Sequence, residues 1–257
     1  MGILPTFANH LIHNPLIMKK AILSGAALLL GLCANAQNVQ LHYDFGHSIY
    51  DELDGRPKLT TTVENFTPDK WGSTFFFIDM DYTGKGIQSA YWEISRELKF
   101  WQAPVSIHLE YNGGLSSSFT FGHDALIGAT YTYNNPSFTR GFTITPMYKH
   151  LGGHDFHTYQ ITGTWYMHFL DGLLTFNGFL DLWGFPQREL IGGPVLKEGD
   201  KFVFLSEPQF WLNLNRIKGI DKDFNLSIGT EMEISRNFAR MDKFACIPTL
   251  AVKWTFN

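Results

Sequence analysis

The sequence predicts an all-β protein, a transmembrane antiparallel β-barrel of about 12 strands. Three observations lead to this fold class. The chain closes on Leu250–Asn257, where apolar and non-apolar residues alternate and an aromatic residue stands next to the end, as in the last strand of such barrels. Roughly a dozen earlier segments alternate in the same way. Beyond the N-terminal region, no stretch holds the roughly 20 apolar residues that a membrane-spanning helix needs.

The N-terminal 36 residues are expected to be absent from the folded protein. Residues 1–17 fit no part of a targeting signal, so we interpret them as a mis-annotated upstream extension. Residues 18–36 have a positively charged start, an apolar run and a small-x-small end at Ala34–Ala36, which is typical of a secretory signal peptide. Cleavage is expected after Ala36, which leaves residues 37–257 as one barrel domain.

The net charge argues against one class of partner, and the cysteine content against stabilisation by disulfides. The formal net charge is -4 and becomes more negative once Lys19 and Lys20 are removed, which argues against nucleic acid as a partner. Cys33 suggests a lipoprotein, but Leu32 is too large for the usual lipobox, so an ordinary signal-peptide cysteine is favoured. Cys246 then stands alone, and no internal disulfide is expected.

Strands are located by side-chain parity, because residues two apart in a strand share a face. In residues 105–112, every second residue is apolar and the others are polar. One face carries Val105, Ile107, Leu109 and Tyr111, and the other carries Ser106, His108, Glu110 and Asn112. The same reading gives twelve strands, near residues 41–45, 58–66, 72–82, 86–96, 105–112, 123–133, 138–149, 158–169, 173–183, 202–215, 224–235 and 244–257.

Turn residues separate these segments. Asp171–Gly172 is short enough for a periplasmic hairpin. The stretch from Pro186 to Asp200 carries Gly, Pro and charges without alternation, so it is expected to be the longest extracellular loop. Pro146, Pro208 and Pro248 are expected at strand ends or bulges, because a proline inside a ladder removes a hydrogen bond.

A soluble sandwich or a lipocalin-like barrel, with the apolar face inward, would also alternate. The placement of aromatic residues favours the membrane barrel, since they lie on the apolar face close to predicted strand ends, where an interface girdle would use them. These residues are Tyr43, Tyr82, Tyr111, Tyr131, Trp165, Trp254 and Phe256.

Residues 68–82 carry a Trp-x-x-x-Phe-Phe-Phe-x-Asp pattern from Trp71 to Asp79. This segment resembles the nucleoside-specific channel-forming family, the Tsx and OmpK-like porins, or a closely related uncharacterised outer-membrane barrel family. A weaker resemblance lies at Ala90–Ser95 and at the C-terminus, and no motif aligns from Gly113 to Asp221. The resemblance implies a monomeric twelve-stranded barrel in the outer membrane of a Gram-negative bacterium, with a lumen that passes nucleosides.

Parity in the same segment gives an independent interpretation. If Thr74, Phe76, Ile78, Met80 and Tyr82 face lipid, then Ser73, Phe75, Phe77, Asp79 and Asp81 face the lumen. Two rings beside two carboxylates suit a flat heterocycle with N–H and hydroxyl donors. The alternative is that the rings only fill a tapered lumen or lie under a loop, and that the carboxylates pair with lumenal bases such as Lys58, Arg96 or Lys253. Both interpretations stay open at the level of the sequence.

Further aromatic residues are predicted to face inward on other strands, namely Tyr91, Tyr166, Phe179, Trp183 and Trp211. Inward acids are expected to outnumber inward bases and to favour neutral or cationic solutes; they include Asp44, Glu64, Glu93, Glu110, Asp181, Glu207, Glu231 and Glu233. The candidate solute-binding residues are Phe75, Phe77, Asp79, Asp81, Tyr91, Glu93, Trp183 and Trp211.

An enzyme is disfavoured. Barrel phospholipases carry a His-x-Ser pair, and no histidine of this chain has Ser two positions later. Asp79 with Asp81, or Glu231 with Glu233, could help bind a hard cation, but no spaced ligand set predicts a catalytic metal, and no cofactor is expected. The sequence therefore predicts a non-enzymatic, monomeric channel in the lipid bilayer for passive diffusion of small solutes, nucleosides first. The alternative is a non-conducting barrel with a structural or partner-binding role.

Overall fold

The computed structural model describes residues 37–117, 121–152, 156–184, 202–238 and 241–256. The predicted extension, signal peptide and cleavage after Ala36 lie outside the described residues, as does the predicted loop from Pro186 to Asp200. No described helix is both long and apolar enough to cross a membrane.

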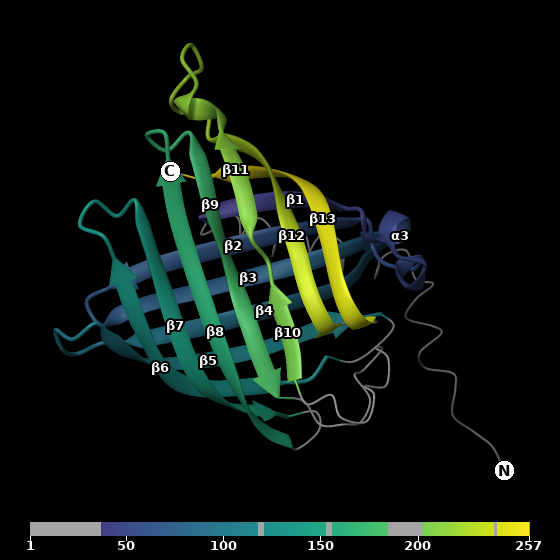
Figure 1. Cartoon of the computed structure of the whole chain (residues 1–257), viewed down its shortest axis with the longest axis horizontal. Helices are drawn as coiled ribbons and strands as arrows, with labels where there is room; N and C mark the ends of the chain where they lie inside the picture. Colours follow the sequence, from purple (N-terminus) through teal and green to yellow (C-terminus); the bar gives the residue numbers. More distant parts are fainter. Residues whose placement is uncertain (1–36, 118–120, 153–155, 185–201, 239–240, 257) are drawn as a thin grey trace, which may run out of the picture.

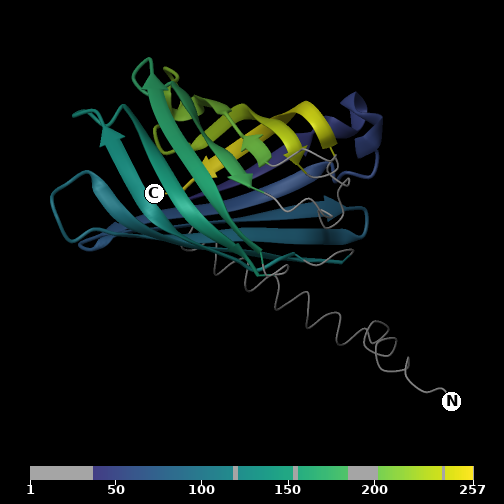
Figure 2. The ribbon, with the colours of Figure 1, turned by 60° about the horizontal axis from the view of Figure 1, so that its bottom comes forward.

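All twelve predicted strands are present, in one antiparallel sheet that closes on itself (Figures 1 and 2). The strands are β1 (Asn38–Asp44), β2 (Leu59–Asp69), β3 (Gly72–Thr83), β4 (Gly86–Leu98), β5 (Val105–Ser116), β6 (Asp124–Asn134), β7 (Arg140–Leu151), β8 (Phe156–Phe169), β9 (Leu174–Gly184), β10 (Phe202–Ser206), β11 (Gln209–Asn213), β12 (Leu226–Phe238) and β13 (Met241–Thr255). Short helical turns are α3 (Gly46–Ile49), η1 (Asp51–Leu53) and η2 (Leu214–Arg216). Both β10 and β11 pair with β9 and with β12, so they occupy one position and the barrel is twelve-stranded.

The first and last strands close the barrel. β1 pairs with β13 from Asn38↔Thr255 to Asp44↔Thr249, and β13 pairs with β12 on its other side. The start of β1 and the end of β13 therefore lie at the same end of the barrel. The turn at Asp171–Gly172 joins β8 to β9 at this end, and both residues have positive φ, as tight hairpin turns require.

Apolar side chains point outward and polar side chains point inward. On β1, Gln40 is 1% exposed while its neighbour Leu41 is 44% exposed. On β5, Ser106 and His108 are buried, whereas Ile107 is exposed. This is the inverse of a soluble barrel, so the soluble alternative is wrong and the transmembrane fold is confirmed.

The outer face carries the expected aromatic residues; Tyr43 and Trp254 lie near strand ends as predicted, whereas Tyr111 and Tyr131 lie inside β5 and β6. Tyr43, Tyr111, Tyr131, Trp254 and Phe256 are between 37% and 42% exposed. One part of the apolar face is buried instead. Val63 and Met80 form a cluster there, with Val39, Ile78, Tyr82 and Ala90 packed against it.

Two of the three prolines depart from the expected places. Pro208 lies in the break between β10 and β11, as predicted. Pro146 and Pro248 lie inside β7 and β13, so for them the prediction was wrong. Neither costs a ladder bond, because the β6–β7 pairing skips the residues opposite Pro146, and Pro248 lies one residue beyond the last residue that pairs with β1.

Gly178 of β9 lets the backbone approach closely at Glu207 and Pro208, where the chain breaks between β10 and β11. Its φ is +155°, and a Cβ at this position would lie 2.5 Å from the carbonyl oxygen of Glu207. Gly178→Val is therefore expected to lower the free energy of unfolding by about 2 kcal/mol or more. Gly163→Ala is the control, since its added Cβ would meet only the side chain of Leu180, at 3.3 Å. Urea unfolding of both variants in lipid vesicles measures the difference, and equal stabilities would contradict this role.

Candidate functional site

All eight predicted solute-binding residues lie on the inward-facing parity of their strands. Phe75, Phe77, Asp79 and Asp81 come from β3, and Tyr91 and Glu93 come from the adjacent β4. Trp183 lies on β9 and Trp211 on β11. The inward direction of β3 is fixed by Asp79 and Asp81, which accept hydrogen bonds from polar side chains of β2 and β4.

The rings of β3 and β4 form a continuous aromatic track. The centroids of Phe75 and Phe77 are 6.2 Å apart, and those of Phe77 and Tyr91 are 6.1 Å apart. Phe121, which precedes β6, extends the track with a centroid 5.6 Å from Tyr91. Such a row of rings can stack flat heterocycles in sequence. Sequence reasoning missed Phe121 because it lies outside a strand and has no parity.

Carboxylates stand beside this track and retain acceptor capacity. Asp79 accepts a bond from Thr62 Oγ1 at 2.5 Å, and Asp81 accepts bonds from Thr60 Oγ1 and Ser89 Oγ, each at 2.7 Å. An ionised carboxylate offers about four acceptor positions, so positions remain for a solute. Glu93 accepts the hydroxyl of Tyr91 at 2.7 Å.

The basic residues considered as ion-pair partners of Asp79 and Asp81 do not contact these carboxylates. Arg96 points to the outer face, where it donates to Asp69 and to Thr74. Lys253 lies over the ring of Trp211. Within the described ranges, neither Asp79 nor Asp81 forms an ion pair with Lys58, Arg96 or Lys253. The three bases named as examples of such partners therefore leave both carboxylates unpaired with them.

Trp183 and Trp211 do not join the aromatic track. The Nζ atom of Lys253 lies 4.1 Å from the ring centroid of Trp211, and that of Lys149 lies 5.1 Å from the ring centroid of Trp183. Trp211 is 1% exposed and donates its Nε1–H to Gln209. An ammonium group thus occupies one face of each ring, which stabilises the lysine by a cation–π interaction.

A second polar network lines the lumen on β4, β5 and the strands that follow them. His108 lies between two carboxylates, with Nδ1 2.6 Å from Glu97 and Nε2 3.0 Å from Glu110. Lys149 donates to Gln160 at 2.8 Å and lies 3.4 Å from Asp124. Parity already placed His108 and Glu110 on one face of β5, but it did not indicate Glu97, which lies on the neighbouring β4.

Acidic side chains dominate the inward face. They are Asp44, Glu64, Asp79, Asp81, Glu93, Glu97, Glu110, Asp124, Asp181, Glu207, Glu231 and Glu233. Positive charge comes from Lys149 and Lys253 on strands and from Arg56 in the segment between η1 and β2. Arg56 could not be found from the sequence, because a residue between elements has no predictable direction.

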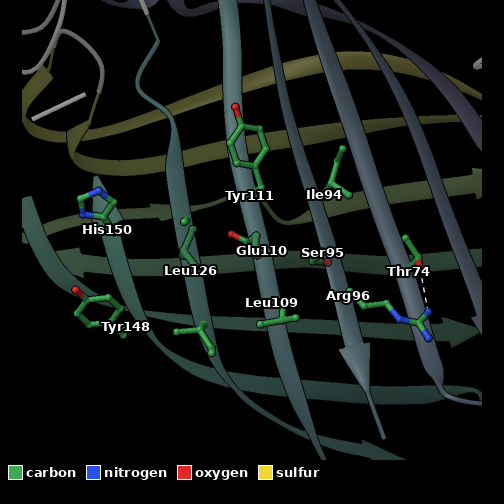
Figure 3. A pocket seen from close by; sticks show the side chains of 12 residues that line it. Thr74, Ile94, Ser95, Arg96, Leu109, Glu110, Tyr111, Leu126, Tyr148 and His150 are labelled. Atoms are coloured by element: carbon green, nitrogen blue, oxygen red, sulfur yellow. Dashed lines mark hydrogen bonds between the residues drawn. The ribbon is translucent and has the colours of Figure 1, made fainter. Parts of the chain in front are cut away.

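A hollow of about 540 Å³ lies on the outer wall rather than in the lumen (Figure 3). Ile94, Leu109, Tyr111 and Tyr148 line it, and all four belong to the exposed apolar face of β4, β5 and β7. It faces hydrocarbon and is not a candidate solute site. In the described part of the chain, no group of three or more His, Cys, Asp or Glu side chains is arranged to hold a metal ion.

The barrel is similar to solved porin structures. One described as a NanC porin is 11% identical, with a TM-score of 0.52 over 85% of this chain and 99% of the porin. A KdgM porin is 12% identical, with a TM-score of 0.45 over 86% of this chain and 98% of the porin. LpxR from Salmonella typhimurium is 10% identical, with a TM-score of 0.47 over 85% of this chain and 99% of LpxR. At such identities the NanC likeness supports the fold alone.

Comparison with curated proteins gave no match. A family model described as "Domain of unknown function (DUF5020)" matches residues 36–256, which span the whole barrel.

Proposed function

Because this chain belongs to the DUF5020 family and folds as a barrel with a polar lumen, we propose that it is a monomeric outer-membrane channel for passive diffusion of small solutes, with nucleosides as the preferred class. The membrane location is supported by the apolar outer face, which would be costly in water. The monomeric state is supported by closure of β1 on β13, which leaves no strand edge that requires a partner along that seam.

Nucleosides are proposed as the solute class because the aromatic track lies beside carboxylates that have spare acceptor positions. Phe75, Phe77 and Tyr91 offer ring faces for a base, and Asp79 and Asp81 can accept from ribose hydroxyls. The resemblance of residues 68–82 to nucleoside-specific channels points to the same class. Several weak stacking positions in series favour conduction, because a solute that binds loosely can leave.

The excess of inward carboxylates adds a charge preference. A lumen lined by one sign of charge concentrates counter-ions and repels ions of the same sign. The channel should therefore pass neutral and cationic solutes more readily than anions.

A non-conducting barrel is the second candidate, and one observation favours it. Leu53, Ala245 and Ile247 pack as an apolar cluster on the lumenal side of β13, so part of the interior is filled by protein. In that case the barrel would serve a structural or partner-binding role.

Single-channel recording in planar bilayers tests both candidates. The purified protein is expected to give steady current steps that added adenosine or uridine reduces reversibly and that glucose leaves unchanged. Conductance that nucleosides do not affect would contradict the solute class but keep the channel. Absence of current steps would refute the channel and support the non-conducting barrel; bilayers with the same detergent but no protein are the control.

A further inference from the structure

At one end of the barrel, β13 extends well beyond its neighbour β1. Pairing between the two strands ends at Asp44↔Thr249, whereas β13 begins at Met241. Residues 241–248 therefore have no β1 residue beside them. An open strand edge is a liability, and proteins cover it with other parts of the chain.

The segment Phe45–Arg56, here called the mouth loop, covers this edge. Phe45 N donates to Pro248 O at 3.2 Å. The hydroxyl of Tyr50 accepts from Cys246 N at 2.9 Å and donates to Cys246 O at 3.4 Å, so it replaces the missing strand at this residue. Figure 1 shows α3, which belongs to this loop, at the end of the barrel opposite the C-terminus.

The mouth loop also turns into the lumen. Leu53 is 2% exposed and packs with Met241, Ala245 and Ile247. Ala245 and Ile247 share the parity of Thr249 and Ala251, which are the buried, inward-facing residues of β13. The loop is thus fixed against the inner wall by apolar burial as well as by hydrogen bonds.

Arg56 ends the mouth loop between two lumenal carboxylates. Its Nε donates to Asp44 Oδ2 at 2.9 Å, and its Nη2 donates to Glu233 Oε2 at 2.6 Å. Burial by itself would lower the pKa of Arg56, but the carboxylates of Glu233 and Asp44 raise it above its usual value. The side chain is 24% exposed, whereas those of Asp44 and Glu233 are 8% and 9% exposed. Arg56 is therefore the more accessible member of this charged group.

The guanidinium group has unused donors. Arginine has five N–H donors, and in the described residues Arg56 uses Nε and Nη2 but not Nη1. Its two partners hold the planar group in one orientation, because each fixes a different edge. A passing solute can therefore meet ordered N–H donors at this end of the lumen.

We propose that Arg56 is a specificity-determining residue of the channel: it neutralises Asp44 and Glu233 at the mouth and presents ordered N–H donors to carbonyl and hydroxyl oxygens of neutral solutes. This inference rests on the proposed function. Without Arg56, two uncompensated carboxylates would stand near Glu231 and Glu207 and would attract cations instead.

The test is the reversal potential in a KCl gradient across planar bilayers. Arg56→Gln is expected to raise the ratio of K⁺ to Cl⁻ permeability by about threefold or more, and Arg56→Lys should restore most of the wild-type ratio. Arg140→Gln is the matched control. Arg140 is exposed and begins β7 at the end of the barrel opposite the mouth loop, so this variant should keep the wild-type ratio of K⁺ to Cl⁻ permeability.

A second variant tests the inference even if Arg56→Gln fails to fold. The triple change Asp44→Asn, Arg56→Gln and Glu233→Gln removes the whole charged group without leaving an unpaired carboxylate, and its K⁺ to Cl⁻ ratio is expected to fall below that of wild type. If wild type conducts and both variants keep its ratio, Arg56 does not set selectivity and the inference is overturned. If wild type gives no current, the proposed function itself is overturned.

Discussion

Replacing Phe77 with alanine is expected to weaken block by nucleosides about tenfold, because stacking on an aromatic ring contributes about 1–3 kcal/mol per base. Phe77 is an inner ring of the track, with its centroid 6.2 Å from that of Phe75 and 6.1 Å from that of Tyr91, so its loss separates Phe75 from the other rings. The measurement is the adenosine concentration that halves single-channel conductance. Ion conductance without nucleoside should rise or stay the same, since the lumen widens.

Phe76→Ala is the matched control for this prediction. Phe76 directly precedes Phe77 in β3 and faces the outer side, so this substitution removes an equal ring without changing the lumen. Its half-blocking concentration should equal that of wild type. Unchanged block in Phe77→Ala, or an equal loss in Phe76→Ala, would show that the track does not bind the solute.

Ile144→Arg is expected to lower the free energy of unfolding by about 2–4 kcal/mol, because a charge on the lipid-facing side of a barrel must enter hydrocarbon. Ile144 lies in the interior of β7 and is 47% exposed on the outer face. Urea unfolding from lipid vesicles, followed by tryptophan fluorescence, measures the change.

Thr143→Arg provides the comparison, since it adds the same charge to the adjacent residue on the opposite face. Thr143 shares a hydrogen bond with Thr164 at 2.7 Å and belongs to the inward parity of β7. Thr143→Arg should lower the free energy of unfolding only slightly, because water in the lumen can solvate the guanidinium group. If Thr143→Arg proved the more damaging change, the assignment of inner and outer faces would be reversed.

Much of the fold could be predicted because alternation is a local property. The segment 105–112 alone specifies which side chains of β5 are buried, and the structure agrees at Ser106, His108 and Asn112. The break at Pro208 was also predictable, since a proline cannot donate within a ladder. Pro146 and Pro248 could not be placed, because whether their missing N–H matters depends on the neighbouring strand, which the sequence does not reveal.

From the sequence, the residues of the candidate site could be grouped only within a single strand. Phe75, Phe77, Asp79 and Asp81 share a face because they lie two residues apart on β3. Whether they bind a nucleoside stays a prediction. The covering of Trp211 by Lys253 joins residues from β11 and β13, and no local pattern indicates it.

The class of fold, the number of strands and the inner and outer face of each follow from alternation within single segments, since a period of two needs no knowledge of the partner strand. Which inward groups meet depends on how the strands come together. Arg56 and Glu233 are 177 residues apart in the chain, yet Arg56 Nη2 lies 2.6 Å from Glu233 Oε2, close to the seam where β1 and β13 close the barrel. The physical reason is that such contacts depend on register and on the path of a loop, and these are set by barrel closure as a whole.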